Sequence, residues 1–112
     1  MSVKIDRLGS SFVKVISEIL ATEIKDENIK FVTITSCDIT NDLSYAKVYF
    51  TVFDIEKKNE TIKALEKAKS FIRGEISKRI NIRHTPELRF IFDESIEYGN
   101  KIEKIINDIN NK

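Results

Sequence analysis

Positively charged side chains are concentrated in one stretch of this 112-residue sequence, from Lys67 to Arg89. The stretch holds seven lysine or arginine residues and two glutamates. Nine cations and eleven carboxylates precede it, and three cations and five carboxylates follow it, so the whole chain carries a formal charge of only +1. Such asymmetry is typical of a surface that binds a polyanion such as nucleic acid. The alternative is a solvated helix face with a chance surplus of charge.

Small residues in this stretch could let a sugar–phosphate backbone approach closely. Apolar residues recur at helical spacing in this stretch and predict a helix. Ser70, Gly74 and Ser77 fall on the side of that helix opposite the apolar residues. Gly74 should cost about 1 kcal/mol relative to alanine inside a helix, which hints at a kink or a close approach. Flanking cations would neutralise phosphates. The predicted contacts are Lys67, Lys69, Ser70, Arg73, Ser77, Lys78, Arg79, Arg83, His84 and Arg89.

The residues needed for catalysis do not form a recognisable set. His84 is the single histidine and Cys37 the single cysteine, so neither a His-based metal cluster nor a disulfide framework is expected. The three glycines of the sequence form neither a Walker A motif nor a G-x-G-x-x-G motif, which are the usual phosphate-binding patterns. The sequence therefore predicts no enzyme, no cofactor, no metal and no small-molecule substrate. Cys37 is interpreted as a small core residue on a strand, and the N-terminus lacks a signal peptide, which favours a soluble cytoplasmic protein.

The elements that must position these residues alternate in a simple order. The predicted order is a helix over 5–25, strands over 31–40 and 45–53, a helix from Asn59 or Thr61 to Ile80, a strand from Pro86, and a last helix from Asp93 or Ser95 with an apolar face of Ile102, Ile105, Ile106 and Ile109. Two early strands and a third after a helical crossover predict an α+β two-layer sandwich. We expect one domain over 1–112, with an ordered core of about 5–109.

The second strand indicates which face of the sheet is covered. Ala46, Val48, Phe50 and Val52 alternate with Tyr45, Lys47, Tyr49, Thr51 and Phe53. Because successive side chains of a strand point to opposite faces, one face is uniformly apolar and the other is mixed. We therefore expect helices on one face and solvent on at least part of the other.

Three blocks of sequence carry a resemblance to a known family. They are DRLGSSFVKVISEIL, VTITSCDITNDLSYAKVYFTV and AKSFIRGEISKRINIRHTPELRFIFDESIEYGNKI, and the last contains the specific pattern P-E-L-x-F-x-x-D-x-S-x-x-x-G-x-x-I. Over about residues 5–109 the chain resembles the ribosome-binding factor A family of bacteria. The resemblance implies a single type II K-homology (KH) domain with three strands and helices on one face.

The resemblance also implies a function in ribosome biogenesis. Members of the family are RNA-binding, non-enzymatic proteins that bind the free 30S small ribosomal subunit near the decoding region of its 16S rRNA. They assist late maturation, including 16S rRNA precursor processing, and matter for growth in the cold. They leave when a GTPase or the initiation machinery completes the subunit. The implied partners are therefore the 30S subunit and 16S rRNA, with no membrane, and we expect a monomer.

One departure from the family pattern concerns the helix after the second strand. Ordinary KH domains clamp RNA with a G-x-x-G loop, which the family replaces by an Ala-x-Gly kink between two helices. The matching residues here are Ala68, Lys69 and Ser70, and serine lacks the freedom of glycine at positive φ. Either the kink keeps ordinary backbone angles, or the break shifts toward Gly74. The expected order is thus α-β-β-α-kink-α-β-α.

Two alternative functions are open at this point. Tyr45, Tyr49 and Phe53 could stack unpaired bases on the open sheet face, with Lys47 and Arg89 nearby, although cross-strand packing is the commoner role of such aromatics. The chain could instead be a protein-interaction or dimerisation module without an RNA role. Its interface would then use the isoleucines of the last helix and an open sheet edge.

Overall fold

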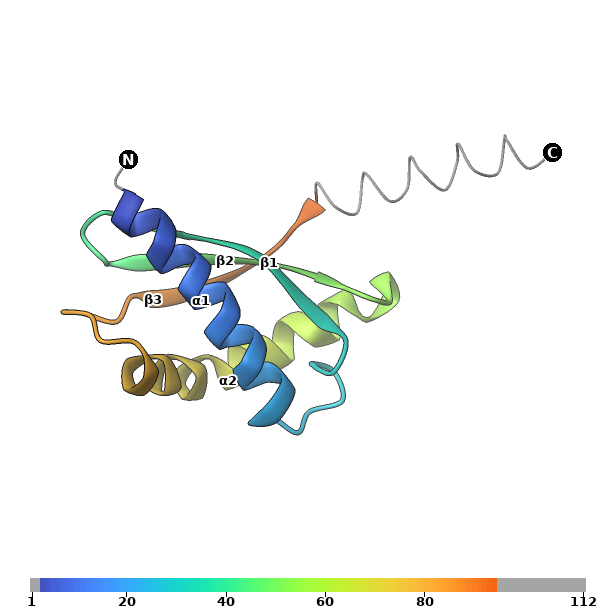
Figure 1. Cartoon of the computed structure of the whole chain (residues 1–112). Coiled ribbons are helices and arrows are strands. Elements are labelled where there is room, and N and C mark those ends of the chain that lie inside the picture. Colours follow the sequence, from blue (N-terminus) through green and yellow to red (C-terminus); the bar gives the residue numbers. More distant parts are fainter. Residues whose placement is uncertain (1–2, 95–112) are drawn as a thin grey trace.

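The computed structural model describes residues 3–94, which form two layers (Figure 1). Its elements are α1 (Val3–Thr22), β1 (Val32–Ile39), β2 (Tyr45–Val52), the short 3₁₀ helix η1 (Ile55–Lys57), α2 (Lys58–Arg79) and β3 (Glu87–Phe92). The α+β two-layer prediction is confirmed, and the elements within residues 3–94 lie within a few residues of their expected bounds. The predicted last helix and its isoleucines lie outside the described residues.

The sheet has the strand order β1-β2-β3. β1 and β2 form an antiparallel hairpin in which Val32 pairs with Val52, whereas β2 and β3 are parallel, with Tyr45 beside Glu87. A parallel pair needs a long crossover connection, and α2 supplies it. The crossover carries the chain from one end of the sheet back to the other, so the segment after α2 lies beside the β1–β2 turn.

The core lies between the helices and one face of the sheet. Completely buried residues are Phe12, Ile16 and Ile19 of α1, Ala46, Val48 and Phe50 of β2, Leu65, Ile72 and Ile76 of α2, and Leu88 of β3. The predicted alternation of β2 and the apolar stripe of α2 are therefore confirmed. The opposite sheet face is uncovered within residues 3–94 and bears the larger polar and aromatic side chains.

The start of α2 differs from the prediction. Asp54 accepts a hydrogen bond from the backbone N–H of Glu56 at 3.1 Å and caps η1, which leads directly into α2 at Lys58. Thr61, predicted as a possible N-cap, is instead 2% exposed and donates to the carbonyl oxygen of Asn28 at 2.9 Å. The Thr61 hydroxyl therefore makes a tertiary hydrogen bond to the α1–β1 connection and does not cap the helix.

The predicted break in the helix does not occur. α2 is one uninterrupted α-helix through Ala68, Lys69, Ser70 and Gly74. None of these residues has a positive φ. Of the two expectations for this segment, ordinary backbone angles are therefore correct and a shifted break at Gly74 is wrong. Serine fits at position 70 because the backbone there has ordinary helical angles, which do not require glycine.

Candidate nucleic-acid interface

Two adjoining hollows lie along α2 and share Ser70, Arg73 and His84. One, of about 480 Å³, is lined by Ser70, Arg73, Gly74 and Ser77 of α2 and by Ile82, Arg83, His84 and Thr85 of the connection to β3. The other, of about 390 Å³, is lined by Lys69, Ser70, Arg73, His84, Ser44, Tyr45, Glu87 and Leu88. We call the two together the α2 groove. Helix α2 forms one wall and the connection over residues 81–86 forms the other.

Arg73 ties the two walls of the α2 groove together. Its Nη2 donates to the carbonyl oxygen of Thr85 at 2.7 Å, and its Nε lies 3.2 Å from the carbonyl oxygens of both Thr85 and Pro86. A planar guanidinium suits this forked arrangement because its donors point in fixed directions. The bonds hold the connection against α2, so Arg83 and His84 are exposed on a fixed wall.

Gly74 leaves the α2 wall open. A Cβ atom built on Gly74 would meet no atom within 4 Å beyond its own helix surroundings, so no internal packing requires glycine at this position. Its carbonyl oxygen accepts a hydrogen bond from the Ser77 hydroxyl at 2.7 Å, which keeps that side chain close to the helix. The three small residues predicted to share one side of the helix, Ser70, Gly74 and Ser77, therefore line the α2 groove together.

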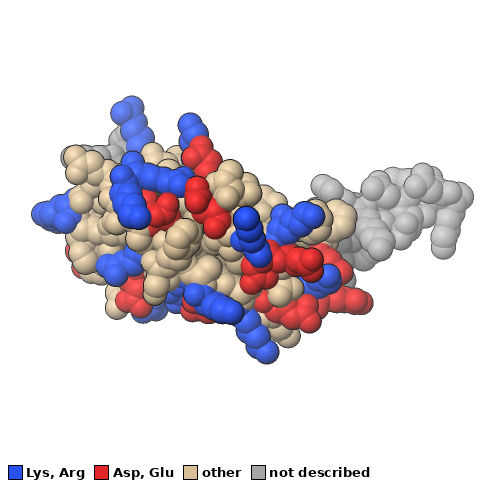
Figure 2. Space-filling model, turned by 90° about the horizontal axis from the view of Figure 1, so that it is seen from below, with Lys and Arg blue, Asp and Glu red and all other residues tan. Residues whose placement is uncertain are grey.

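Several predicted cations are paired with carboxylates of the protein itself. The pairs are Lys69–Glu66 at 2.6 Å, Lys78–Glu75 at 3.1 Å, Arg79–Glu75 at 3.4 Å and Arg79–Glu23 at 3.5 Å. The hydrogen bond from Lys78, and then the charges of Lys78 and Arg79, lower the pKa of Glu75. Exposed pairs of this kind are worth little and can exchange partners. Figure 2 shows lysines and arginines interspersed with carboxylates on the face that it displays.

The ten predicted contact residues do not share one surface. Lys69, Ser70, Arg73, Ser77, Arg83 and His84 line the α2 groove. Lys67, Lys78 and Arg79 lie on α2 but are outside that lining. Arg89 is on the uncovered sheet face, where its guanidinium carbon lies 4.1 Å from the centre of the Tyr45 ring. Strand alternation directs Arg89 away from the face that carries α2, although the Tyr45 ring that it covers belongs to the lining of the α2 groove.

Sequence reasoning missed several contributors to the α2 groove, among them Ile82, Glu87 and Leu88. Ser44 and Tyr45 enter it from the β1–β2 turn, and Thr85 supplies the carbonyl that holds Arg73. The Ser44 carbonyl accepts from the backbone N–H of Glu87 at 3.0 Å, which fixes the turn beside β3. The only indication for Thr85 in the sequence was its position before Pro86, which favours an extended backbone. The parallel β2–β3 register, which brings in Tyr45, had no signal in the sequence.

The aromatic residues of the uncovered sheet face make the cross-strand contacts expected of packing pairs. The Phe31 and Phe53 rings lie 5.9 Å apart, and Arg89 covers the Tyr45 ring. Tyr49 is half-buried. Phe53 is nevertheless 87% exposed, which leaves one broad apolar side chain available to a ligand.

The described residues contain no cluster suited to metal binding. No group of three histidine, cysteine, aspartate or glutamate side chains within residues 3–94 is close enough to hold an ion. Burial, and secondarily the charge of Asp38, raises the pKa of Cys37 to about 12, so its thiol stays protonated. No helix in the same range could span a membrane.

Comparison with known proteins agrees with the resemblance found in the sequence. The family model of ribosome-binding factor A matches residues 4–106. Ribosome-binding factor A of Staphylococcus carnosus is 50% identical over 98% of this chain and 96% of its own length, and that of Macrococcus caseolyticus is 46% identical over 98% and 97%.

Two solved structures have a similar fold. A putative ribosome binding factor A of Thermotoga maritima superimposes with a TM-score of 0.66 and 31% identity, covering 76% of this chain and 82% of its own. Ribosome-binding factor A of Thermus thermophilus gives 0.68 and 21%, covering 77% and 91%. On the family match and the close relatives, the chain belongs to the ribosome-binding factor A family.

Proposed function

We propose that this protein is a non-enzymatic assembly factor that binds the free 30S subunit and its 16S rRNA in the cytoplasm. Its relatives are named for ribosome binding. A Thermus thermophilus homologue with a TM-score of 0.67 and 20% identity was fitted into the map of a 30S complex, which supports the same partner here. The finer proposal, by analogy with the family, is a type II KH domain that assists 16S rRNA precursor processing, including in the cold.

The observation that carries this proposal is the lining of the α2 groove between α2 and the 81–86 connection. Arg73, Arg83 and His84 line the hollow between α2 and the connection together with Gly74 and two serines. No carboxylate belongs to the lining of that hollow, and Glu87 lines the adjoining one. Phosphate groups of an RNA strand could lie against the bare helix at Gly74 while the arginines donate hydrogen bonds to them. Such contacts recognise folded RNA by shape, as fits a surface without a base-reading set.

Arg73 can hold the connection against α2 and also bind a phosphate. Its bonds to the connection use Nε–H and Nη2, and a guanidinium has five N–H donors, so donors are left for a phosphate. Replacing Arg73 by glutamate would therefore remove a charge and release the connection at once. Arg83 gives the cleaner test because it is exposed and makes no hydrogen bond or ion pair within the described residues.

The test is co-sedimentation of the protein with purified 30S subunits across a salt series. Arg83→Glu should weaken binding roughly tenfold or more, since a hydrogen bond to a charged group contributes about 1.5–3 kcal/mol. The slope of log affinity against log salt should fall by about one contact, or roughly 0.7–0.9. Lys63→Glu, a reversal on α2 outside the groove, is the control. Binding by Arg83→Glu equal to that of the control would overturn the α2 groove as the RNA site.

A second candidate uses base stacking on the uncovered sheet face, and the exposure of Phe53 favours it. Stacking contributes about 1–3 kcal/mol per base and does not release counterions. Phe53→Ala would then lower 30S affinity at an unchanged salt slope. An unchanged affinity would leave Phe53 with its packing role against Phe31 alone.

A further inference from the structure

A further hollow lies at the end of the molecule that carries the β1–β2 turn. Its volume is about 600 Å³, and its lining comes from 5–11 of α1, 41–43 of the turn and 80–83 after α2. We call it the end pocket. Ile82 and Arg83 belong to its lining and also to that of the α2 groove, so a strand lying in the α2 groove can reach into it.

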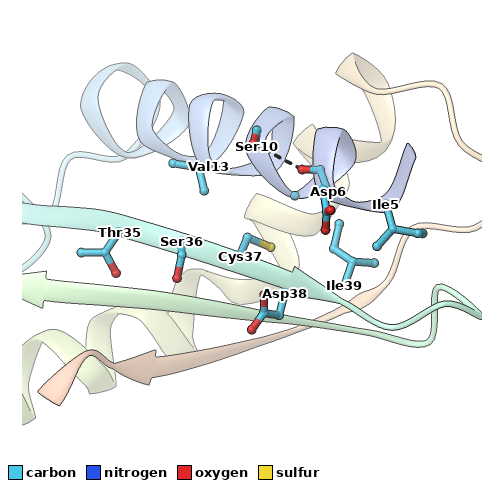
Figure 3. A pocket seen from close by; sticks show the side chains of 10 residues that line it. Ile5, Asp6, Ser10, Val13, Thr35, Ser36, Cys37, Asp38 and Ile39 are labelled. Carbon is cyan, nitrogen blue, oxygen red and sulfur yellow. Dashed lines mark hydrogen bonds between the residues drawn. The ribbon is translucent and has the colours of Figure 1, made fainter. Parts of the chain in front are cut away.

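The wall of the end pocket is largely aliphatic. Its five aliphatic residues are half-buried, pack against the core and keep part of their surface in the pocket; they are Ile5, Leu8, Leu43, Ile80 and Ile82. Figure 3 shows Ile5 at the first turn of α1, with its side chain directed toward the sheet. Covering the remaining surface of these side chains favours a ligand with an apolar face.

The β1–β2 turn holds Leu43 in a fixed position. Leu43 has a φ of 62°, in the left-handed region that leucine rarely adopts. Its N–H donates to the carbonyl oxygen of Thr40 at 2.9 Å, and the Ser44 N–H donates to side-chain oxygens of Thr40 and Asp42 at 3.0 Å. These bonds over-determine the backbone, so the wall is preformed and a ligand does not have to order it.

The rim of the end pocket suits an anionic ligand with a polar ring edge. Arg7 and Arg83 are exposed, and no carboxylate belongs to the lining. Neither guanidinium makes a hydrogen bond or ion pair within residues 3–94, and the exposed amides of Asn41 and Asn81 have no partner in that range either. The pocket thus combines an apolar wall, amide donors and acceptors, and two positive charges. Unpaired nucleotides are recognised by this combination of contacts.

The neighbouring hollow between α1 and β1 does not extend this site (Figure 3). It shares Ile5 with the end pocket, but it also includes the exposed carboxylate of Asp6, which repels phosphate. Its two walls are in backbone contact, since a Cβ atom built on Gly9 would lie 2.5 Å from the carbonyl oxygen of Cys37. The charge of the α2 groove therefore continues into the end pocket and not into the hollow between α1 and β1.

We propose that the end pocket binds one unpaired base of the RNA whose backbone lies in the α2 groove. The base packs on the aliphatic wall, its edge bonds to the amides of Asn41 and Asn81, and its phosphate lies beside Arg83. This inference rests on the proposed function, because the strand in the α2 groove brings the base to the pocket. It adds a contact that requires an unpaired nucleotide and does not depend on charge alone.

The first test fills the end pocket without removing a charge. Ser11 is exposed on α1 and lines the pocket, so Ser11→Trp places an indole ring there. Ser17→Trp, the same change at an exposed position of α1 outside the lining, is the matched control. In co-sedimentation with 30S subunits, Ser11→Trp should bind roughly tenfold more weakly, as for the loss of one stacked base, at an unchanged salt slope. Equal affinities of the two variants would overturn the proposal.

The second test uses the original chain and therefore does not depend on the folding of a variant. In nuclear magnetic resonance spectra of the ¹³C-methyl-labelled protein, hexaadenylate RNA should shift the methyl signals of Leu8, Leu43 and Ile82. An abasic oligonucleotide of the same length, which keeps every phosphate, should not shift them. Equal shifts with both ligands, or no shift of these methyl groups with about 1 mM hexaadenylate, would overturn the proposal, since that concentration exceeds the dissociation constant of a weak complex.

Two comparisons separate this inference from the proposed function and from a protein ligand. If Arg83→Glu weakens 30S binding while Ser11→Trp behaves as its control, the base site is wrong and the α2 groove stands. If Ser11→Trp weakens binding to 30S subunits but not to isolated 16S rRNA, the end pocket contacts a ribosomal protein, and a bound RNA base is excluded. Absence of 30S binding by the original chain would overturn the proposed function and this inference together.

Discussion

The α2 groove and the hollow between α1 and β1 are each bounded by one helix and contain one helical glycine, yet the two glycines have different surroundings. Arg73, Arg83 and His84 line the first together with Glu87, and the second is lined by Asp6, Asp38 and mostly small or apolar residues. Gly9 is in contact with β1, whereas Gly74 faces open space. The comparison teaches that a helical glycine can serve internal packing at one place and leave the helix surface open at another.

The largest effect is expected from filling the tight contact between α1 and β1. Gly9→Ala would place Cβ against the Cys37 carbonyl oxygen, so α1 would have to move. Overpacking against backbone should reduce the free energy of unfolding by about 2–3 kcal/mol. Urea denaturation measures this, with Ser17→Ala as the exposed control on α1. Equal stabilities of the two variants would show that α1 is not held tightly by β1.

The next effect concerns the rigidity of the α2 groove. Arg73→Lys keeps the positive charge but cannot reproduce the forked bonds to Thr85 and Pro86. We expect faster amide exchange over residues 81–85 and a roughly tenfold loss of 30S affinity, as for the loss of one charged hydrogen bond. Arg79→Lys, on the same helix but outside the groove lining, is the control for the exchange of arginine by lysine. If exchange rises but affinity does not change, the fixed connection is not part of the binding site.

Gly74→Ala should act in the opposite direction to Gly9→Ala. Alanine has room and favours the helix, so the free energy of unfolding should rise by about 1 kcal/mol. If an RNA strand lies against the helix there, 30S affinity should fall although the protein is more stable. Denaturation and co-sedimentation on the same preparation separate the two effects. Higher stability with unchanged affinity would show that no ligand approaches Gly74.

The smallest effect is expected at the β1–β2 turn. Hydrogen bonds from Ser44 and Thr40 lower the pKa of Asp42 from 3.8 to about 2. Because the folded pKa is depressed, the stabilisation is present above about pH 4 and is lost as the pH falls through 2. A carboxyl titration by nuclear magnetic resonance should give this low midpoint. Asp42→Asn should remove that step from the pH dependence of stability, and a midpoint near 3.8 would contradict the hydrogen-bonded turn.

Local periodicity predicted most of the fold. The alternation of β2 and the stripe of Leu65, Ile72 and Ile76 in α2 follow from which side chains must be buried, and the structure confirms both. The helix start was mispredicted because Thr61 bonds to Asn28, which is 33 positions away along the chain. Propensity rules weigh neighbours in sequence, so a tertiary partner of this kind leaves no local signal.

The candidate site was predicted only in part, because a count of charges along a segment mixes different faces of the molecule. Alternation already placed Arg89 opposite Leu88, so its separation from the helix cations could have been foreseen. The pairing of Lys78 with Glu75 was also available from their helical spacing. By contrast, the bonds from Arg73 to Thr85 and Pro86 depend on how the connection folds back, which no residue pattern encodes.

The parallel pairing of β3 with β2 has a consequence for how the molecule is made. The β1–β2 hairpin can form from neighbouring residues, but β3 joins only after α2 has crossed the sheet. Until residues 87–92 have been synthesised, the edge of β2 that later pairs with β3 is unprotected. An unprotected strand edge can pair with other chains. Completion of the sheet during synthesis is thus the step at which this protein is most open to aggregation.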